Sequence, residues 1–177
     1  MSIRVGFFGK LPSRGDFVRV SLPRAVAAPW DQWLQSVLPA AEARLGGCWS
    51  DAWHAARAWR FAFAPGVCGP QPVTGVWLPS IDKVGRTFPL MIAVPAAAVD
   101  DAFLAAVECA GADAIRSVMT PDMLAECLNR APCPVSAASA ASNPAVRWWR
   151  RTEGIEGAVL RGDALPGADT FIRMLAA

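Results

Sequence analysis

The apolar positions of the chain fall into short runs typical of strands and into longer stretches with the period of a helix. Six short runs, bounded by glycine, proline or charged residues, are predicted strands: residues 3–8, 60–64, 75–78, 90–94, 146–149 and 158–160. Two polar loops adjoin these runs, at residues 10–16 and 79–89. The second loop, bounded by Pro79 and Pro89, separates two predicted strands and is where chemistry is expected first.

Helical spacing begins at residue 26 and continues through several tryptophans. Pro29 and Pro39 each suit the first turn of a helix, so two short helices are predicted before the Gly46-Gly47 pair. Trp49 and Trp53 extend the apolar stripe into a further helical turn.

The second half of the chain contains the clearest helical periods. A long helix is predicted over residues 99–118, with Asp100 at its positive N-terminal end. Another helix is expected to begin after its cap, Thr120, and to run to about residue 129. A short amphipathic helix from about residue 168 closes the chain.

Strands that alternate with helices, without a long tract of hairpins, predict a layered α/β domain with a mixed sheet flanked by helices. An α+β domain is the alternative. A chain of 177 residues fits one domain over residues 1–177, because this length buries a sizeable core. Residues 131–145, rich in alanine, serine and proline without any period, are predicted to form a flexible loop.

Composition and charge restrict the classes of partner. Hydrophobic residues make up 54% of the chain and charged residues 18%, so part of the apolar excess is expected to face a partner. The formal net charge is only +2 and the basic residues are scattered, which argues against nucleic acid. No apolar run approaches the roughly 20 residues of a membrane-spanning helix, so no membrane insertion is expected.

The five cysteines are odd in number and contain no Cys-x-x-Cys pair, which argues against a disulfide framework and against a zinc site. No signal-peptide pattern opens the sequence. A cytoplasmic location is therefore expected, with no metal and no cofactor.

Enzymatic interpretations of the polar loops are weaker than structural ones. The glycines around Lys10 lack the spacing of a phosphate loop. A nucleophilic site would combine Ser80 with Asp82 and the single histidine, His54, yet no Gly-x-Ser-x-Gly elbow surrounds the serine. We favour the interpretation that Ser80 and Asp82 brace a turn through nearby backbone groups, and we assign no catalytic residue.

The two polar loops each follow or separate predicted strands, and they are expected to lie side by side at one edge of the sheet. Their polar side chains would then form a mixed-charge cluster, the candidate binding site, which consists of Lys10, Arg14, Asp16, Ser80, Asp82 and Arg86. Two interpretations stay open: the cluster contacts a partner, or it is an internal ion-pair network that fixes two glycine-rich loops.

Four segments carry a resemblance to a known family: GFFGKLPSRGDFVR at 6–19, WDQWL at 30–34, WRFAFAPGVCG at 59–69 and GVWLPSIDKVGRTFPL at 75–90. With the Trp148-Trp149 pair and the C-terminal Leu165-Pro166, they resemble the TagF (ImpM) family over nearly the full chain.

The resemblance implies a compact α/β domain that accompanies type VI secretion in Gram-negative bacteria and acts after translation to hold the apparatus inactive. It implies no known catalysis, and it implies a forkhead-associated scaffold protein of the apparatus as the partner. The leading hypothesis is therefore a regulatory binding protein. The alternatives are a small hydrolase or ligand-binding enzyme that uses the loop 79–89, and a structural subunit of the baseplate or sheath.

Overall fold

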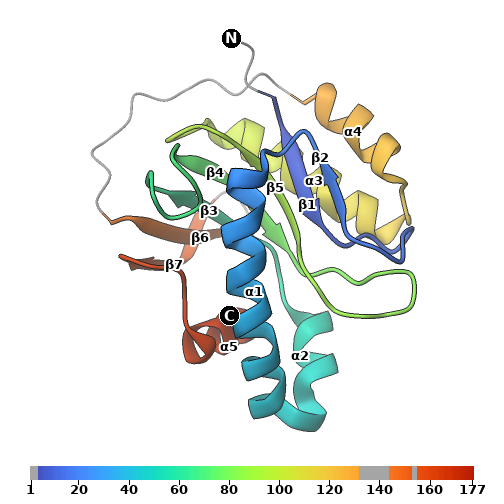
Figure 1. Cartoon of the computed structure of the whole chain (residues 1–177), viewed down its shortest axis with the longest axis vertical. Helices are drawn as coiled ribbons and strands as arrows, with labels where there is room; N and C mark the ends of the chain where they lie inside the picture. Colours follow the sequence, from blue (N-terminus) through green and yellow to red (C-terminus); the bar gives the residue numbers. More distant parts are fainter. Residues whose placement is uncertain (1–3, 132–143, 153–154) are drawn as a thin grey trace.

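The computed structural model describes residues 4–131, 144–152 and 155–177, which form one sheet with helices on both faces (Figure 1). The strands are β1 (Gly6–Gly9), β2 (Val18–Val20), β3 (Trp59–Phe63), β4 (Val73–Leu78), β5 (Leu90–Val94), β6 (Val146–Thr152) and β7 (Ile155–Gly162). The helices are α1 (Arg24–Leu45), α2 (Trp49–Ala55), α3 (Asp101–Arg116), α4 (Pro121–Asn129) and α5 (Ala168–Ala176), with a 3₁₀ turn, η1 (Gly46–Cys48). The flexible loop predicted at 131–145 lies almost wholly outside the described residues.

The strands are ordered β2-β1-β5-β4-β3-β6-β7. This layered arrangement of sheet and helices confirms the predicted fold class, α/β with α+β as its alternative. The expectation of a mixed sheet is wrong in detail, because every strand pairing among the described residues is antiparallel. The physical reason is that β3, β4 and β5 follow one another through loops, and a parallel pair would need a helical crossover between them.

Helix α1 corrects the prediction of two short helices. It is continuous over 22 residues, with Pro29 and Pro39 inside it. Each proline removes one backbone hydrogen bond, at a cost of about 3 kcal/mol in a helix interior. A single buried stripe nevertheless continues across both positions, so packing against the sheet outweighs the local loss. That stripe consists of Val26, Ala27, Trp30, Leu34, Val37, Leu38 and Ala41.

The caps predicted for the next two helices are present. The Asp100 carboxylate accepts a hydrogen bond from the Phe103 amide at 2.7 Å, at the start of α3. The Thr120 hydroxyl accepts one from the Met123 amide at 3.3 Å, and Pro121 occupies the first turn of α4. These side chains satisfy amide groups that the first turn of a helix leaves unpaired.

Two hydrophobic layers lie on opposite faces of the sheet. One layer packs under α1, α2 and α5, and the other under α3 and α4. Trp148 lies in the first layer and Trp149 in the second, as expected for adjacent residues on a strand. In the first layer the rings of Trp30, Phe61, Phe63 and Trp148 contact one another, with centroids 4.5–5.9 Å apart.

Helix α3 ends in a strained turn. The Met119 amide bonds the Ala114 carbonyl at 2.9 Å, and the Val118 amide bonds the Ile115 carbonyl at 3.5 Å. This is a Schellman motif, in which the Val118 position usually holds glycine, because it needs a left-handed backbone. Val118 has φ 54°, a conformation unfavourable for a β-branched residue.

Replacing this valine should therefore stabilise the protein. We expect Val118→Gly to raise the free energy of unfolding by roughly 0.5–1 kcal/mol, since the relief of strain exceeds the entropy that glycine adds to the unfolded chain. Urea denaturation measures the difference. Val84→Gly, at another exposed valine without positive φ, is the matched control and should not stabilise. A Val118→Gly variant less stable than wild type would contradict the strain argument.

Candidate functional site

The loop between β1 and β2 and the loop between β4 and β5 lie side by side, because β1 is paired with β5 in the sheet. The Lys83 amide donates a hydrogen bond to the Arg14 carbonyl at 2.8 Å. The Arg86 guanidinium donates one to the Gly15 carbonyl at 2.7 Å. Each loop therefore supports the backbone of the other.

Asp82 is the centre of this arrangement and is only 1% exposed. Its Oδ2 accepts hydrogen bonds from Lys10 Nζ at 2.9 Å and from Arg86 Nε at 2.6 Å. Its Oδ1 accepts the backbone amides of Val84 at 3.0 Å and Arg86 at 2.9 Å. The aspartate side chain closes the turn on its own backbone while it neutralises a buried lysine.

The electrostatics of this carboxylate follow from its partners. Burial by itself would raise the pKa of Asp82, but the hydrogen bonds from Lys10, Arg86 and the two amides outweigh it and hold that pKa well below its usual range. The carboxylate therefore stays charged at neutral pH with its oxygens occupied. It is unsuited to take up a proton as a general base.

Ser80 is also occupied by structural contacts. Its hydroxyl donates a hydrogen bond to the Lys10 carbonyl at 2.8 Å, and its own carbonyl accepts one from Trp53 Nε1 at 3.0 Å. His54 is exposed on α2, and its Nδ1 lies 2.7 Å from the Ser50 carbonyl. The grouping of Ser80, Asp82 and His54 that a hydrolase would need is therefore not assembled.

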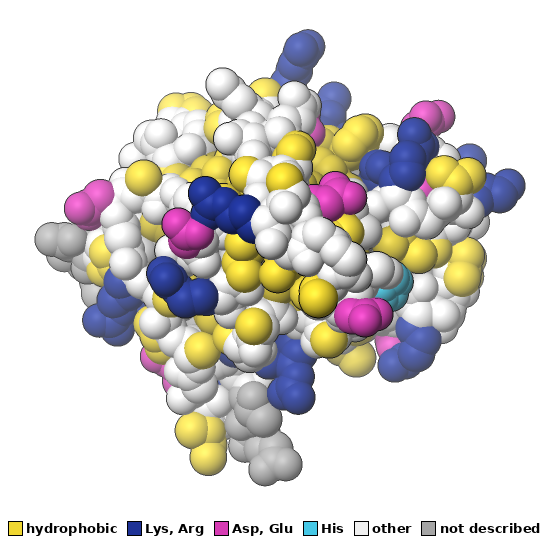
Figure 2. Space-filling view, turned by 90° about the horizontal axis from the view of Figure 1, so that it is seen from below, with side chains coloured by type: hydrophobic (Ala, Val, Ile, Leu, Met, Phe, Trp, Pro, Cys, Tyr) yellow, Lys and Arg dark blue, Asp and Glu magenta, His cyan; other side chains and the backbone are white. Residues whose placement is uncertain are grey.

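At the end of the molecule that carries α2 and α5, neither positive nor negative side chains dominate the surface (Figure 2). Figure 2 shows basic and acidic side chains intermixed with hydrophobic ones over this face. Such an intermixed surface neither attracts nor repels a charged partner strongly.

Arg14 and Asp16 behave differently from the other members of the predicted cluster. Both are exposed, and within the described part of the chain their side chains form no hydrogen bond or ion pair. The predicted cluster therefore divides in two. Lys10, Ser80, Asp82 and Arg86 form the network that fixes the loops, and Arg14 and Asp16 project from it.

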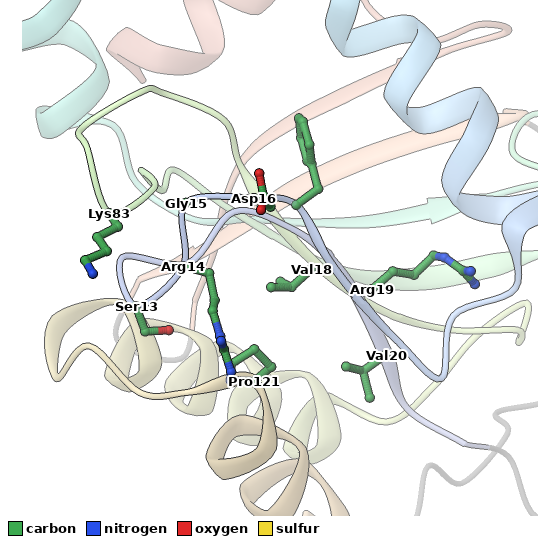
Figure 3. Close-up of a pocket in the computed structure, with 10 residues that line it drawn as sticks. Ser13, Arg14, Gly15, Asp16, Val18, Arg19, Val20, Lys83 and Pro121 are labelled. Atoms are coloured by element: carbon green, nitrogen blue, oxygen red, sulfur yellow. The ribbon is translucent and has the colours of Figure 1, made fainter.

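An open cleft of about 520 Å³ lies beside the loops, between β2 and the start of α4. It is lined by Ser13, Arg14, Gly15, Asp16, Phe17, Val18, Arg19, Val20, Lys83 and Pro121. The Arg14 side chain reaches across it toward Pro121, and Val18 and Val20 point into it (Figure 3). Arg19 points the other way and donates a hydrogen bond to the Leu22 carbonyl at 2.9 Å.

Sequence reasoning missed this cleft, because Pro121 is about a hundred positions away from the loop that it faces. A hydrogen bond from the Ser13 hydroxyl to the Met119 carbonyl, at 2.7 Å, connects the loop to the turn before α4. No local pattern in the sequence predicts that contact. The alternation of Val18, Arg19 and Val20 was the one available signal of a strand there.

Three features of the described residues concern metal binding, membrane spans and one buried thiol. These residues contain no group of three or more His, Cys, Asp or Glu side chains placed to hold a metal ion. None of their helices combines the length and the apolar character needed to cross a membrane. Burial raises the pKa of Cys68 to about 12, so this thiol is inert at neutral pH.

The fold and the site define a small α/β protein whose polar loops are fixed by a buried ion pair beside an open cleft. The family model of the TagF N-terminal domain, described as type VI secretion system-associated, matches residues 6–130. The chain belongs to this family, which confirms the resemblance found in the sequence. It is therefore a type VI secretion system-associated protein.

Comparison with solved structures extends the similarity to almost the whole chain. The crystal structure of PA0076 from Pseudomonas aeruginosa PAO1 is similar to this fold, with a TM-score of 0.70 and 35% sequence identity. The similarity covers 97% of this chain and 93% of PA0076. A search of curated proteins found no match. Because the similarity to PA0076 covers almost the whole chain, the strands and the helix that follow residue 130, outside the family match, also have a structural counterpart.

Proposed function

We propose that this protein is a cytoplasmic regulator of the type VI secretion apparatus that acts after translation. In this proposal it is a binding protein and not an enzyme: it binds one component of the apparatus and represses assembly or firing. The partner we propose is the forkhead-associated scaffold protein of the apparatus. Membership of the TagF family supports the link to secretion.

One observation carries the proposal of a binding role. The polar side chains that could have served catalysis are used to fix two loops, while Arg14 and Lys83 remain exposed on the loops that the network holds. A rigid scaffold that presents exposed charged side chains suits recognition, because little conformational entropy is lost on binding. The hydrolase alternative loses its support, since His54 bonds Ser50 and not Ser80.

The test is capture and secretion in a host that carries the apparatus. The tagged wild-type chain, purified at native expression level, should recover the forkhead-associated scaffold, whereas an unrelated tagged protein of similar size should not. Deletion of the gene should raise secretion by the apparatus, and the wild-type chain should restore repression without any change in the abundance of the apparatus proteins. Recovery of no secretion component, or unchanged secretion after deletion, would refute the proposal.

A further inference from the structure

The cleft lies beside β2, the strand at one end of the sheet. Strand β2 is the first in the strand order, so its outer edge pairs with no other strand among the described residues. A free edge presents unpaired backbone N–H and C=O groups, onto which an extended segment of another chain can add as a strand. The residues of β2 line the cleft, and Pro121 at the start of α4 bounds it on the other side.

The charges around this edge are unbalanced. The loops 10–16 and 79–89 contain four basic and two acidic residues, a formal surplus of two positive charges, and two of the basic residues pair with the buried Asp82. Arg14 and Lys83 are exposed, and in the described ranges neither has a carboxylate partner. Asp16 is directed away from Arg14 (Figure 3). The cleft therefore carries a surplus of positive charge that an acidic partner would complement.

One exposed aromatic side chain, Phe17, lines the cleft, and other exposed apolar residues are near the lining residues in the sequence. Among the described residues, the exposed large hydrophobic side chains are those of Phe17, Val84, Val118, Met123 and Ile155. All of these except Ile155 line the cleft or lie within three positions of a residue that lines it. Phe17 is therefore the exposed apolar side chain that a partner in the cleft would contact.

Phe17 is held in place although it is 51% exposed. Its ring lies 4.7 Å from that of Phe88 and 5.8 Å from that of Phe8, between centroids, and Lys10 Nζ lies 5.3 Å from its ring centroid. An aromatic side chain that is fixed before binding loses little entropy when a partner packs against it. Phe17 is therefore well suited to anchor an apolar side chain of a bound segment.

We propose that this cleft binds an acidic, extended segment of a partner protein, which adds along the free edge of β2. Carboxylates of the segment pair with Arg14 and Lys83, and an apolar side chain packs on Phe17. This inference rests on the proposed function, in that the segment belongs to the bound secretion component, and it names the surface and the chemistry of that contact.

A synthetic peptide tests the inference without the secretion apparatus. The probe is a fluorescein-labelled dodecapeptide of Asp and Glu with two central leucines, measured by fluorescence anisotropy against the full chain. We expect the wild type to bind it and Arg14→Glu/Lys83→Glu to bind at least tenfold more weakly. The matched control, Arg161→Glu, changes the charge of an exposed side chain on β7 at the opposite edge of the sheet, and its affinity should stay within twofold of wild type.

Two controls fix the interpretation of the result. Thermal unfolding should show that the double variant is folded, since both side chains are exposed and the backbone hydrogen bond from the amide of residue 83 to the carbonyl of residue 14 is retained. A lysine-rich dodecapeptide with the same leucines should not bind. Amide chemical shifts of the wild type should change around residues 13–20 when the acidic peptide is added.

The inference is overturned if the wild type does not bind the acidic probe. It is also overturned if Arg14→Glu/Lys83→Glu binds the probe as well as the wild type and the Arg161→Glu control do. Displacement of the probe by inorganic phosphate at equal concentration would also overturn it, in favour of a simple anion site. These outcomes are distinct from failure of the proposed function. A chain that binds the peptide but captures no secretion component would retain the cleft chemistry and lose the regulatory role.

Discussion

Asp82→Ala is expected to lower the free energy of unfolding by about 3–5 kcal/mol, because it leaves Lys10 buried without its counter-ion. The turn around Val84 and Arg86 also loses the acceptor for its two amides. Urea denaturation with a fixed m-value measures the loss. The matched control is Asp16→Ala, in the neighbouring loop and exposed, which should change stability by no more than about 0.5 kcal/mol.

A double variant separates the ion pair from the turn. Lys10→Met/Asp82→Ala should be less destabilised than the sum of its two single variants, since the unpaired buried charge is absent. Additive losses, or an Asp82→Ala variant within about 1 kcal/mol of wild type, would show that the buried pair is not what holds the loops together.

The free energy of unfolding at acid pH gives an independent check on the ion pair between Lys10 and Asp82. Because the pKa of Asp82 is lower in the folded protein than in the unfolded chain, its contribution is fully present above the unfolded pKa of about 4. That contribution is lost as the pH falls below this value toward the folded pKa. The difference in stability between wild type and Asp82→Asn should therefore shrink below about pH 4, and a constant difference would argue against this linkage.

Trp30→Ala is the second substitution with a large expected effect, a loss of about 3–5 kcal/mol, because it empties the centre of the aromatic layer under α1. Trp30 is fully buried, and its indole N–H has no hydrogen-bond partner among the described residues. Trp30→Phe keeps most of the ring volume and removes that unpaired donor, so it should cost less than half as much. Guanidinium denaturation compares the two variants.

Two results would contradict this account of the core. If Trp30→Ala cost less than about 1.5 kcal/mol, the layer would have collapsed into the space or would contribute little to stability. If Trp30→Phe were as damaging as Trp30→Ala, the indole nitrogen would have a role that its buried, unpaired position does not show.

The sequence predicts best those elements that are specified by residues close to one another along the chain. The helices after Asp100 and Thr120 have both a regular apolar period and a capping side chain next to it. Strand β2 was missed, because three residues give too short an alternation to recognise. The continuity of α1 across Pro29 was mispredicted, because that outcome depends on packing against the distant strands β3 and β6.

The candidate site shows the same division. The bracing role of Asp82 follows from short-range turn chemistry, and the structure contains it. Whether Arg14 joins that network or projects from it depends on the exact path of two loops, which composition does not specify. The cleft also needs α4 to lie against β2, a tertiary contact that leaves no periodic trace in the sequence.

The position of β6 in the sheet has a consequence for how the protein is made. Residues 146–149 cover the edge of β3 and contribute Trp148 to the aromatic layer, yet they are translated more than 80 residues after β3. At typical translation speeds that delay is on the order of ten seconds. During this interval the nascent chain on the ribosome carries an uncovered strand and an unfinished core. A chaperone that shields β3 until the C-terminal hairpin emerges would have its greatest effect on the yield of native protein in that interval.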